Sequence, residues 1–172
     1  TIKVTGDPES TTDDYWLYHV NQSDDDVGEW VETVEPGLDN NIDPATMPVK
    51  MVRAAPDPWD DAFADDFGRP TFSLSQIDWT GRIAGDEETA PDPSFIGETI
   101  NDMSFHKNRL SILAGENVIL SELGAFFNYY ATTATDLLDT DMIDLSAPTN
   151  EVSILHNFVP FNENLMIFSD FG

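Results

Sequence analysis

Residues 109–121 have the sequence Arg109-Leu-Ser-Ile-Leu-Ala-Gly-Glu-Asn-Val-Ile-Leu-Ser121. Two short apolar runs, 109–113 and 118–121, flank the tight-turn sequence Ala114-Gly-Glu-Asn117. Apolar runs separated by a few residues that include Gly are typical of a β-hairpin. This segment therefore predicts two neighbouring antiparallel strands.

The same pattern recurs on both sides of this hairpin, which indicates a mainly β fold. Alternation and turn residues predict strands near 2–5, 14–20, 30–34, 109–113, 118–121, 152–156 and 164–169. Residues 46–53, 71–75 and 100–106 predict further short strands, with Pro48 at a sheet edge or a strand start. Short strands at this spacing are typical of a sandwich, a barrel or propeller blades.

Two segments predict short helices within this β-rich chain. Trp59, Phe63 and Phe67 are spaced i, i+4 and i+8, which would place them on one helix face. An irregular acidic excursion fits the same residues equally well. Residues 135–145 are ambiguous and fit a single helical turn.

The composition limits the classes of function. The chain has 172 residues with 33 acidic and 7 basic side chains, a formal net charge of −26, and 40% hydrophobic residues, enough for a core. This charge repels phosphate backbones and anionic lipid, which argues against sequence-specific nucleic-acid binding but not against passage of DNA. The acidity fits a solvated, salt-adapted surface, an acidic lumen or a cation-binding surface. No apolar run approaches the ~20 residues of a membrane helix.

The motifs of enzymes and metal sites are weak or missing. The chain has no Cys, which excludes disulfides, thiolate zinc sites and Cys nucleophiles, and its three His are scattered singly. Asp139-Thr-Asp-Met-Ile-Asp144 resembles a calcium loop but has no Gly at the sixth position. Neither a Gly-x-Ser-x-Gly elbow nor a phosphate-binding glycine loop occurs. We therefore expect no catalytic residue, no metal and no cofactor.

An aromatic cluster and a basic cluster supply the candidate contact residues. The aromatic cluster is costly to leave in water and predicts core or subunit packing. The basic residues either pair with the surplus carboxylates or contact a neighbouring subunit. The candidates are Phe126, Phe127, Tyr129, Tyr130, Lys107 and Arg109.

Several motifs in order resemble one known family. They include Phe105-His-Lys-Asn-Arg-Leu110, Ala114-Gly-Glu-Asn-Val-Ile-Leu-Ser121, Gly124-Ala-Phe-Phe-Asn128 and Val159-Pro-Phe-Asn-Glu-Asn-Leu-Met-Ile-Phe-Ser169. With upstream motifs such as Lys3-Val-Thr-Gly-Asp7, the chain resembles the tail tubular protein B, or nozzle protein, family of short-tailed bacteriophages (podoviruses). It departs from the family at Lys107, where Arg is frequent, and in the acidic, Pro-rich stretch 56–70. Family members are much longer, so we expect an internal fragment.

The resemblance implies a structural virion protein of the tail. It implies a homohexameric ring, docked to the tail tubular protein A adaptor and to a tail fibre protein, with transient non-specific passage of DNA and no stable nucleic-acid binding. For the fold, it implies an acidic antiparallel β domain at 1–99, inserted or preceding, with a loop at 54–70 and a linker at 84–97. Residues 100–172 would then form the first blades of a β-propeller-like nozzle body.

Two other classes of function fit the composition. A carbohydrate-binding or depolymerising β domain would use the abundant acids, as a pair of carboxylates, and the four Trp residues. A secreted, calcium-dependent adhesin module would use the acids as cation ligands. The order of the motifs favours the structural virion protein.

Overall fold

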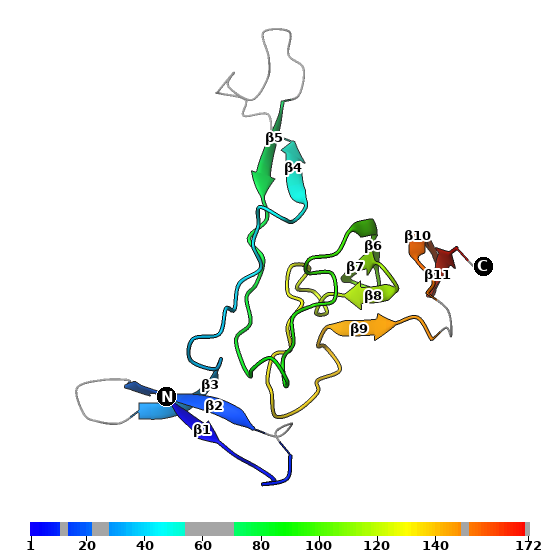
Figure 1. The fold of residues 1–172 in the computed structure, drawn as a ribbon. Coiled ribbons are helices and arrows are strands. Elements are labelled where there is room, and N and C mark those ends of the chain that lie inside the picture. The colour runs from blue at the N-terminus through cyan, green and yellow to red at the C-terminus, as the bar shows by residue number, and fades with distance from the viewer. Residues whose placement is uncertain (11–13, 22–27, 54–70, 149–151, 171–172) are drawn as a thin grey trace. The chain divides into compact units, whose positions relative to one another are not determined.

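The computed structural model describes residues 1–10, 14–21, 28–53, 71–148 and 152–170 (Figure 1). Every regular element within these residues is a β-strand. The strands are β1 (Ile2–Val4), β2 (Tyr15–Asn21), β3 (Gly28–Thr33), β4 (Val49–Arg53), β5 (Phe72–Gln76), β6 (Ile100–His106), β7 (Arg109–Ala114), β8 (Asn117–Leu120), β9 (Ile143–Ser146), β10 (Leu155–Phe161) and β11 (Asn164–Ser169). The prediction of a mainly β fold is confirmed. The helix considered for 59–67 lies outside the described residues.

The described strands form antiparallel sheets between chain neighbours. One sheet has the order β1-β2-β3, another has the order β6-β7-β8-β9, and β4-β5 and β10-β11 are two-stranded. Short loops between consecutive strands favour antiparallel pairing, because antiparallel strands can be joined by a turn of two residues whereas parallel strands need a long crossover. The turn between β6 and β7 is of this kind, with φ of 46° at Lys107 and 60° at Asn108. Whether such sheets continue into a propeller in the longer protein stays a prediction.

Most strand predictions agree with the structure to within two residues. The strand expected over 100–106 is β6, and the strand expected over 164–169 is β11. Pro48 directly precedes β4, as its lack of an N–H donor predicts. The Ala114–Asn117 turn joins β7 to β8, with a φ of 56° at Gly115 that favours glycine.

The strand predicted over 152–156 is wrong in position. The backbone there is extended only from Leu155, and β10 runs on to Phe161 through Pro160. Pro160 lies opposite Leu165, one pair away from the two-residue loop that Phe161 and Asn164 close. In a hairpin that pair is not hydrogen-bonded, so the missing N–H faces away from β11 and costs no ladder bond.

The ambiguous segment 135–145 contains no helix; it has a single hydrogen-bonded turn, from the Asp141 N–H to the Leu138 carbonyl (3.0 Å). Within the described residues this segment is a loop that leads into β9 at Ile143. Its organiser is the buried carboxylate of Asp141, which accepts hydrogen bonds from the N–H and hydroxyl of Thr132 (3.2 and 2.8 Å) and the N–H of Leu138 (2.9 Å). These bonds hold the backbone at Thr132 and Leu138 to the Asp141 side chain.

The contacts divide the chain into two units. One unit comprises Thr1–Ile42 with Thr80–Gly172, and the other comprises Asp43–Trp79 and carries the β4–β5 ribbon. The division of the protein at residues 99 and 100 stays a prediction.

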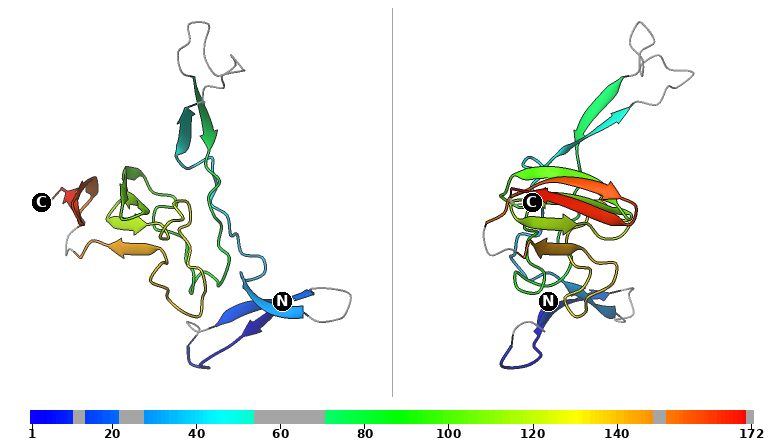
Figure 2. Two further views of the ribbon diagram at one scale, coloured as in Figure 1. Left: turned by 180° about the vertical axis from the view of Figure 1, so that it is seen from behind. Right: turned by 90° about the vertical axis from the view of Figure 1, so that its right-hand side faces the viewer.

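The core of the larger unit lies on both faces of β7, whose six residues are all buried. On one face Leu113 packs with Leu155 and Phe158 of the β10–β11 hairpin, which lies across the β6–β9 sheet in the right-hand view of Figure 2. The N–H of Phe158 also donates to the Asp102 carboxylate on β6 (2.8 Å). Full burial of an aliphatic side chain such as Leu113 stabilises the fold by roughly 1.5–3 kcal/mol.

Candidate functional surfaces

Tyr129 and Tyr130 lie inside the fold, with 0% and 2% of their surface exposed. The Tyr129 hydroxyl donates to the Leu110 carbonyl (2.9 Å), and its ring meets the edge of Phe95 at 5.0 Å between centroids. Burial raises the pKa of the Tyr129 phenol far above its ordinary value. Both tyrosines, although expected either in the core or between subunits, are therefore placed in the core of a single chain.

The hydroxyl of Tyr130 joins an ionic group in which the guanidinium is buried and the carboxylate side chain is 57% exposed. It donates to the Asp92 carboxylate (2.8 Å), which also pairs with the Arg82 guanidinium (2.8 Å). Arg82 lies over the Tyr130 ring at 5.1 Å and donates to the carbonyls of Ala90 (2.6 Å) and Asp39 (3.1 Å). Burial and the bond to Asp92 raise the pKa of the Tyr130 hydroxyl, so it stays protonated at neutral pH. This group ties three loop segments together.

Phe126 and Phe127 lie nearer the surface and are half-buried. The Phe126 ring meets the ring of Phe105 edge-on at 5.1 Å, and Phe105 itself is 62% exposed. These rings form a partly uncovered aromatic surface beside the end of β6. The assignment of Phe126 and Phe127 to subunit contact stays a prediction.

The two basic candidates have different environments. Arg109 is 8% exposed, and its guanidinium donates to the carbonyls of Ser121 (2.7 Å), Asp139 (3.1 Å) and Asp141. Lys107 is exposed in the β6–β7 turn. Arg109 therefore holds a loop onto the β6–β9 sheet, whereas Lys107 is free to meet solvent or a neighbour.

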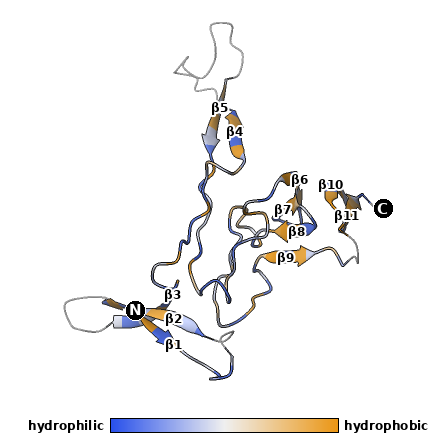
Figure 3. Cartoon of the chain, viewed as in Figure 1, coloured by the Kyte–Doolittle hydropathy of each residue, from blue (hydrophilic) through white to orange (hydrophobic). Residues whose placement is uncertain are grey.

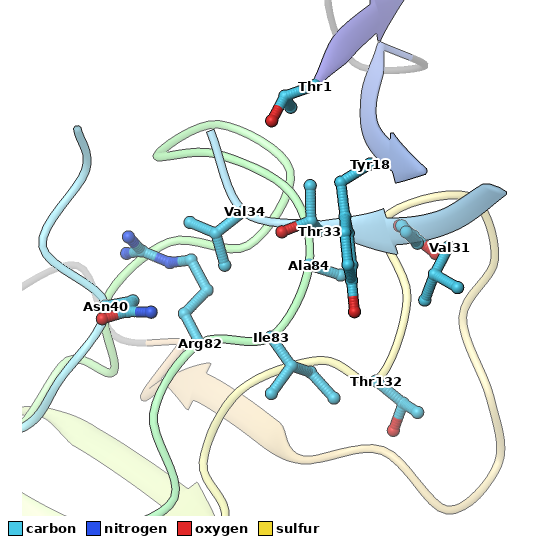
Figure 4. Close-up of a pocket in the computed structure, with 11 residues that line it drawn as sticks. Thr1, Tyr18, Val31, Thr33, Val34, Asn40, Arg82, Ile83, Ala84 and Thr132 are labelled. Carbon is cyan, nitrogen blue, oxygen red and sulfur yellow. The ribbon is translucent and has the colours of Figure 1, made fainter. Parts of the chain in front are cut away.

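A cavity of about 720 Å³ opens between β2, β3 and the segment around Arg82. In Figure 4 the Tyr18 ring stands across this cavity, and the Arg82 side chain extends toward Asn40. The charged groups among its lining residues are engaged elsewhere: Arg82 with Asp92, and Glu32 with the Thr133 hydroxyl and the Ala134 N–H (both 2.6 Å). Among the described residues, the cavity wall thus offers no pair of free carboxylates for glycoside chemistry.

The acids of the calcium-like segment are also used structurally. Asp141 is the loop organiser described above, and Asp144 accepts from the Ser94 N–H (2.8 Å). Across the described ranges, no three His, Asp or Glu side chains lie close enough together to hold a metal ion. The same ranges contain no helix with the length and apolarity needed to cross a bilayer.

Two apolar sheet faces are not covered by any of the residues that the structure describes. On one face of the β4–β5 ribbon the exposed apolar side chains are Val49, Met51, Phe72 and Leu74. On the outer side of the β10–β11 hairpin they are Val159, Phe161, Met166 and Phe168. Faces of this kind mark surfaces that other polypeptide covers.

The sequence did not indicate Arg82 and Asp141 as key residues. Both act on backbone groups or side chains that the fold brings together, so no motif surrounds them. For Arg82, the only signal in the sequence was the small number of basic residues. With 7 basic against 33 acidic side chains, each basic residue is a candidate for a specific ion pair.

Linked antiparallel sheets, charged groups engaged in structural bonds and exposed apolar faces among the described residues fit a structural protein of a larger assembly. The chain belongs to the bacteriophage nozzle protein family, whose model matches residues 1–172. It is 36% identical over 169 residues to the tail tubular protein gp12 of Escherichia phage T7, a match that covers 98% of this chain and 19% of that protein. The chain is thus a structural nozzle component of a phage tail, and the resemblance found in its motifs is confirmed.

Proposed function

We propose that this chain forms part of the wall of a hexameric nozzle ring through which DNA leaves the virion. The observation that carries the proposal is the large excess of acidic over basic residues. With 33 acids against 7 basic residues, the surface keeps DNA counterions in place and offers few phosphate anchors. A conduit needs this property, because DNA that binds tightly to the wall of a channel cannot move through it.

The positions of the basic residues support this proposal. Lys3 pairs with Asp14 (2.8 Å), Arg82 pairs with Asp92, and Arg109 is buried against carbonyl oxygens. Cations used in this way are not available to phosphate groups. These three positive charges therefore stabilise the fold, and the net charge of the chain is strongly negative.

The proposed partners follow from the family. The ring would dock to the tail tubular protein A adaptor and contact a tail fibre protein, and the chain would act without catalysis or a cofactor. The 19% coverage of the phage T7 protein means that further contacts with these partners would come from the rest of the nozzle protein.

The test uses the full-length nozzle protein that contains this chain. Mass measurement and electron microscopy, with and without the adaptor, should show a closed ring. Filter binding near physiological salt should show no saturable binding of duplex DNA at micromolar protein. A monomeric protein that binds DNA tightly, or that cleaves a host polysaccharide, would contradict the proposal.

A further inference from the structure

The β4–β5 ribbon has one apolar face that the described residues do not cover. The register pairs Val49 with Gln76, Met51 with Leu74 and Arg53 with Phe72. Because side chains alternate along a strand, these pairs share one face, which we call the ribbon face (Val49, Met51, Arg53, Phe72, Leu74 and Gln76). Its apolar members are 55%, 66%, 57% and 69% exposed at Val49, Met51, Phe72 and Leu74.

This exposure is unusual for a strand pair. All ten residues of β4 and β5 are exposed, and Figure 3 shows both hydrophobic and hydrophilic positions along the two strands. A two-stranded ribbon is marginally stable in water unless a further strand or surface packs against it. The ribbon face therefore fits a surface that another polypeptide covers.

The charge of the ribbon indicates the chemistry of that partner. The two strands contain Lys50 and Arg53 and no acidic residue, in a chain whose net charge is −26. Neither cation forms an ion pair with a described residue, whereas Lys3 and Arg82 do. Arg53 lies on the ribbon face, and Lys50 lies on the opposite face with Val52, Ser73 and Ser75. An apolar strip with adjacent positive charge is complementary to an acidic protein surface.

We propose that the ribbon face packs against the acidic surface of a second copy of this chain, the neighbouring subunit of the ring. This inference rests on the proposed function, because a ring places identical acidic chains side by side. A ring uses heterologous contacts, in which one patch of a subunit meets a different patch of the next. The ribbon supplies the apolar, cationic patch, Arg53 pairs with carboxylates of the neighbour, and Lys50 adds a longer-range attraction.

The first experiment places a photo-crosslinking amino acid at Leu74 or Ser75 in the full-length nozzle protein. The two positions are adjacent but lie on opposite faces of the ribbon. Irradiated rings should give covalent dimers of the chain from position 74, at least tenfold more than from position 75. Crosslinks within one chain, or equal yields from the two positions, would overturn the proposal. So would a crosslink from position 74 that forms only to the adaptor or fibre protein.

The second experiment changes the face itself. Met51→Ser with Leu74→Ser, and separately Arg53→Glu, should raise the concentration needed for half-maximal ring assembly at least tenfold. Arg53→Lys should change it less than threefold. Leu137→Ser is the matched control, because Leu137 is 81% exposed in a loop of the other unit. Melting curves of the variants establish that they fold.

The outcomes separate this inference from the proposed function. If the unmodified protein forms no ring, both fail. If it forms rings that the ribbon variants leave intact, the ribbon inference fails while the ring stands.

Discussion

Replacing Arg109 with Met should strongly destabilise the fold, although no chemistry depends on this residue. The guanidinium donates to the carbonyls of Ser121, Asp139 and Asp141, which fixes the 121–141 loop on β7. Hydrogen bonds to a charged group contribute about 1.5–3 kcal/mol each, and removal of one partner from a buried polar group leaves the others unsatisfied. Since Met retains part of the packing volume, we expect a loss of roughly 3–5 kcal/mol.

The assay is urea or thermal unfolding of the 172-residue chain, followed by near-UV circular dichroism. For a chain of this size, a loss of 3–5 kcal/mol corresponds to a fall in Tm of about 6–20 °C. Lys107→Asn is the matched control, because Lys107 is exposed and its φ of 46° suits Asn. It should change the free energy of unfolding by less than about 0.5 kcal/mol. A loss below about 1 kcal/mol for Arg109→Met, or an equal loss for Lys107→Asn, would refute the structural role of Arg109.

Three further predictions concern pH, aromatic packing and salt. The Lys3 ammonium bonded to Asp14, with help from the Gly6 N–H, holds the pKa of Asp14 below its ordinary value. This stabilisation is present above the unfolded pKa of about 4 and is lost as pH falls through the folded pKa. The Tm difference between wild type and Asp14→Asn should therefore vanish in acid. A Tm difference that stays constant with pH would contradict this prediction. Phe126→Ser and Phe105→Ser should show a coupling of about 0.5–1.5 kcal/mol in a double-mutant cycle, because the rings meet edge-on, and additive losses would disprove the contact. The Tm of the chain should rise with sodium chloride, since the Debye length falls from ~10 Å at 0.1 M to ~3 Å at 1 M; a flat trend would mean that the acids are locally compensated.

Local patterns were enough to place most strands. β6 and β11 coincide with their predicted ranges, because alternation and flanking turn residues are both encoded within a few positions. The error at β10 has a different origin. Pro160 is acceptable there only because it occupies a pair without hydrogen bonds, a condition set by the register against β11.

The roles of the charged residues could not be predicted in the same way. For Arg109 the sequence left open pairing with carboxylates or contact with a neighbour, and its partners are backbone carbonyls 12 to 32 positions away. The Asp141 carboxylate likewise accepts hydrogen bonds from Thr132 and Leu138. Backbone acceptors and donors carry no residue-type signal, so only the folded loop reveals these bonds.

The placement of the cations links the stability of the fold to its proposed role as a conduit. Arg82 and Arg109 are buried and bonded within the chain, so each stabilises loops without adding a phosphate anchor to the surface. The exceptions among the described residues are Lys107 in the β6–β7 turn and, on β4, Lys50 and Arg53, which are exposed on opposite faces of the ribbon. Left open, such a pair would attract DNA phosphates, whereas coverage by an acidic neighbour would neutralise it. On this argument, ring closure would bury the exposed apolar side chains of the ribbon. It would also neutralise the exposed cations of β4, so that the wall of the channel would present predominantly negative charge.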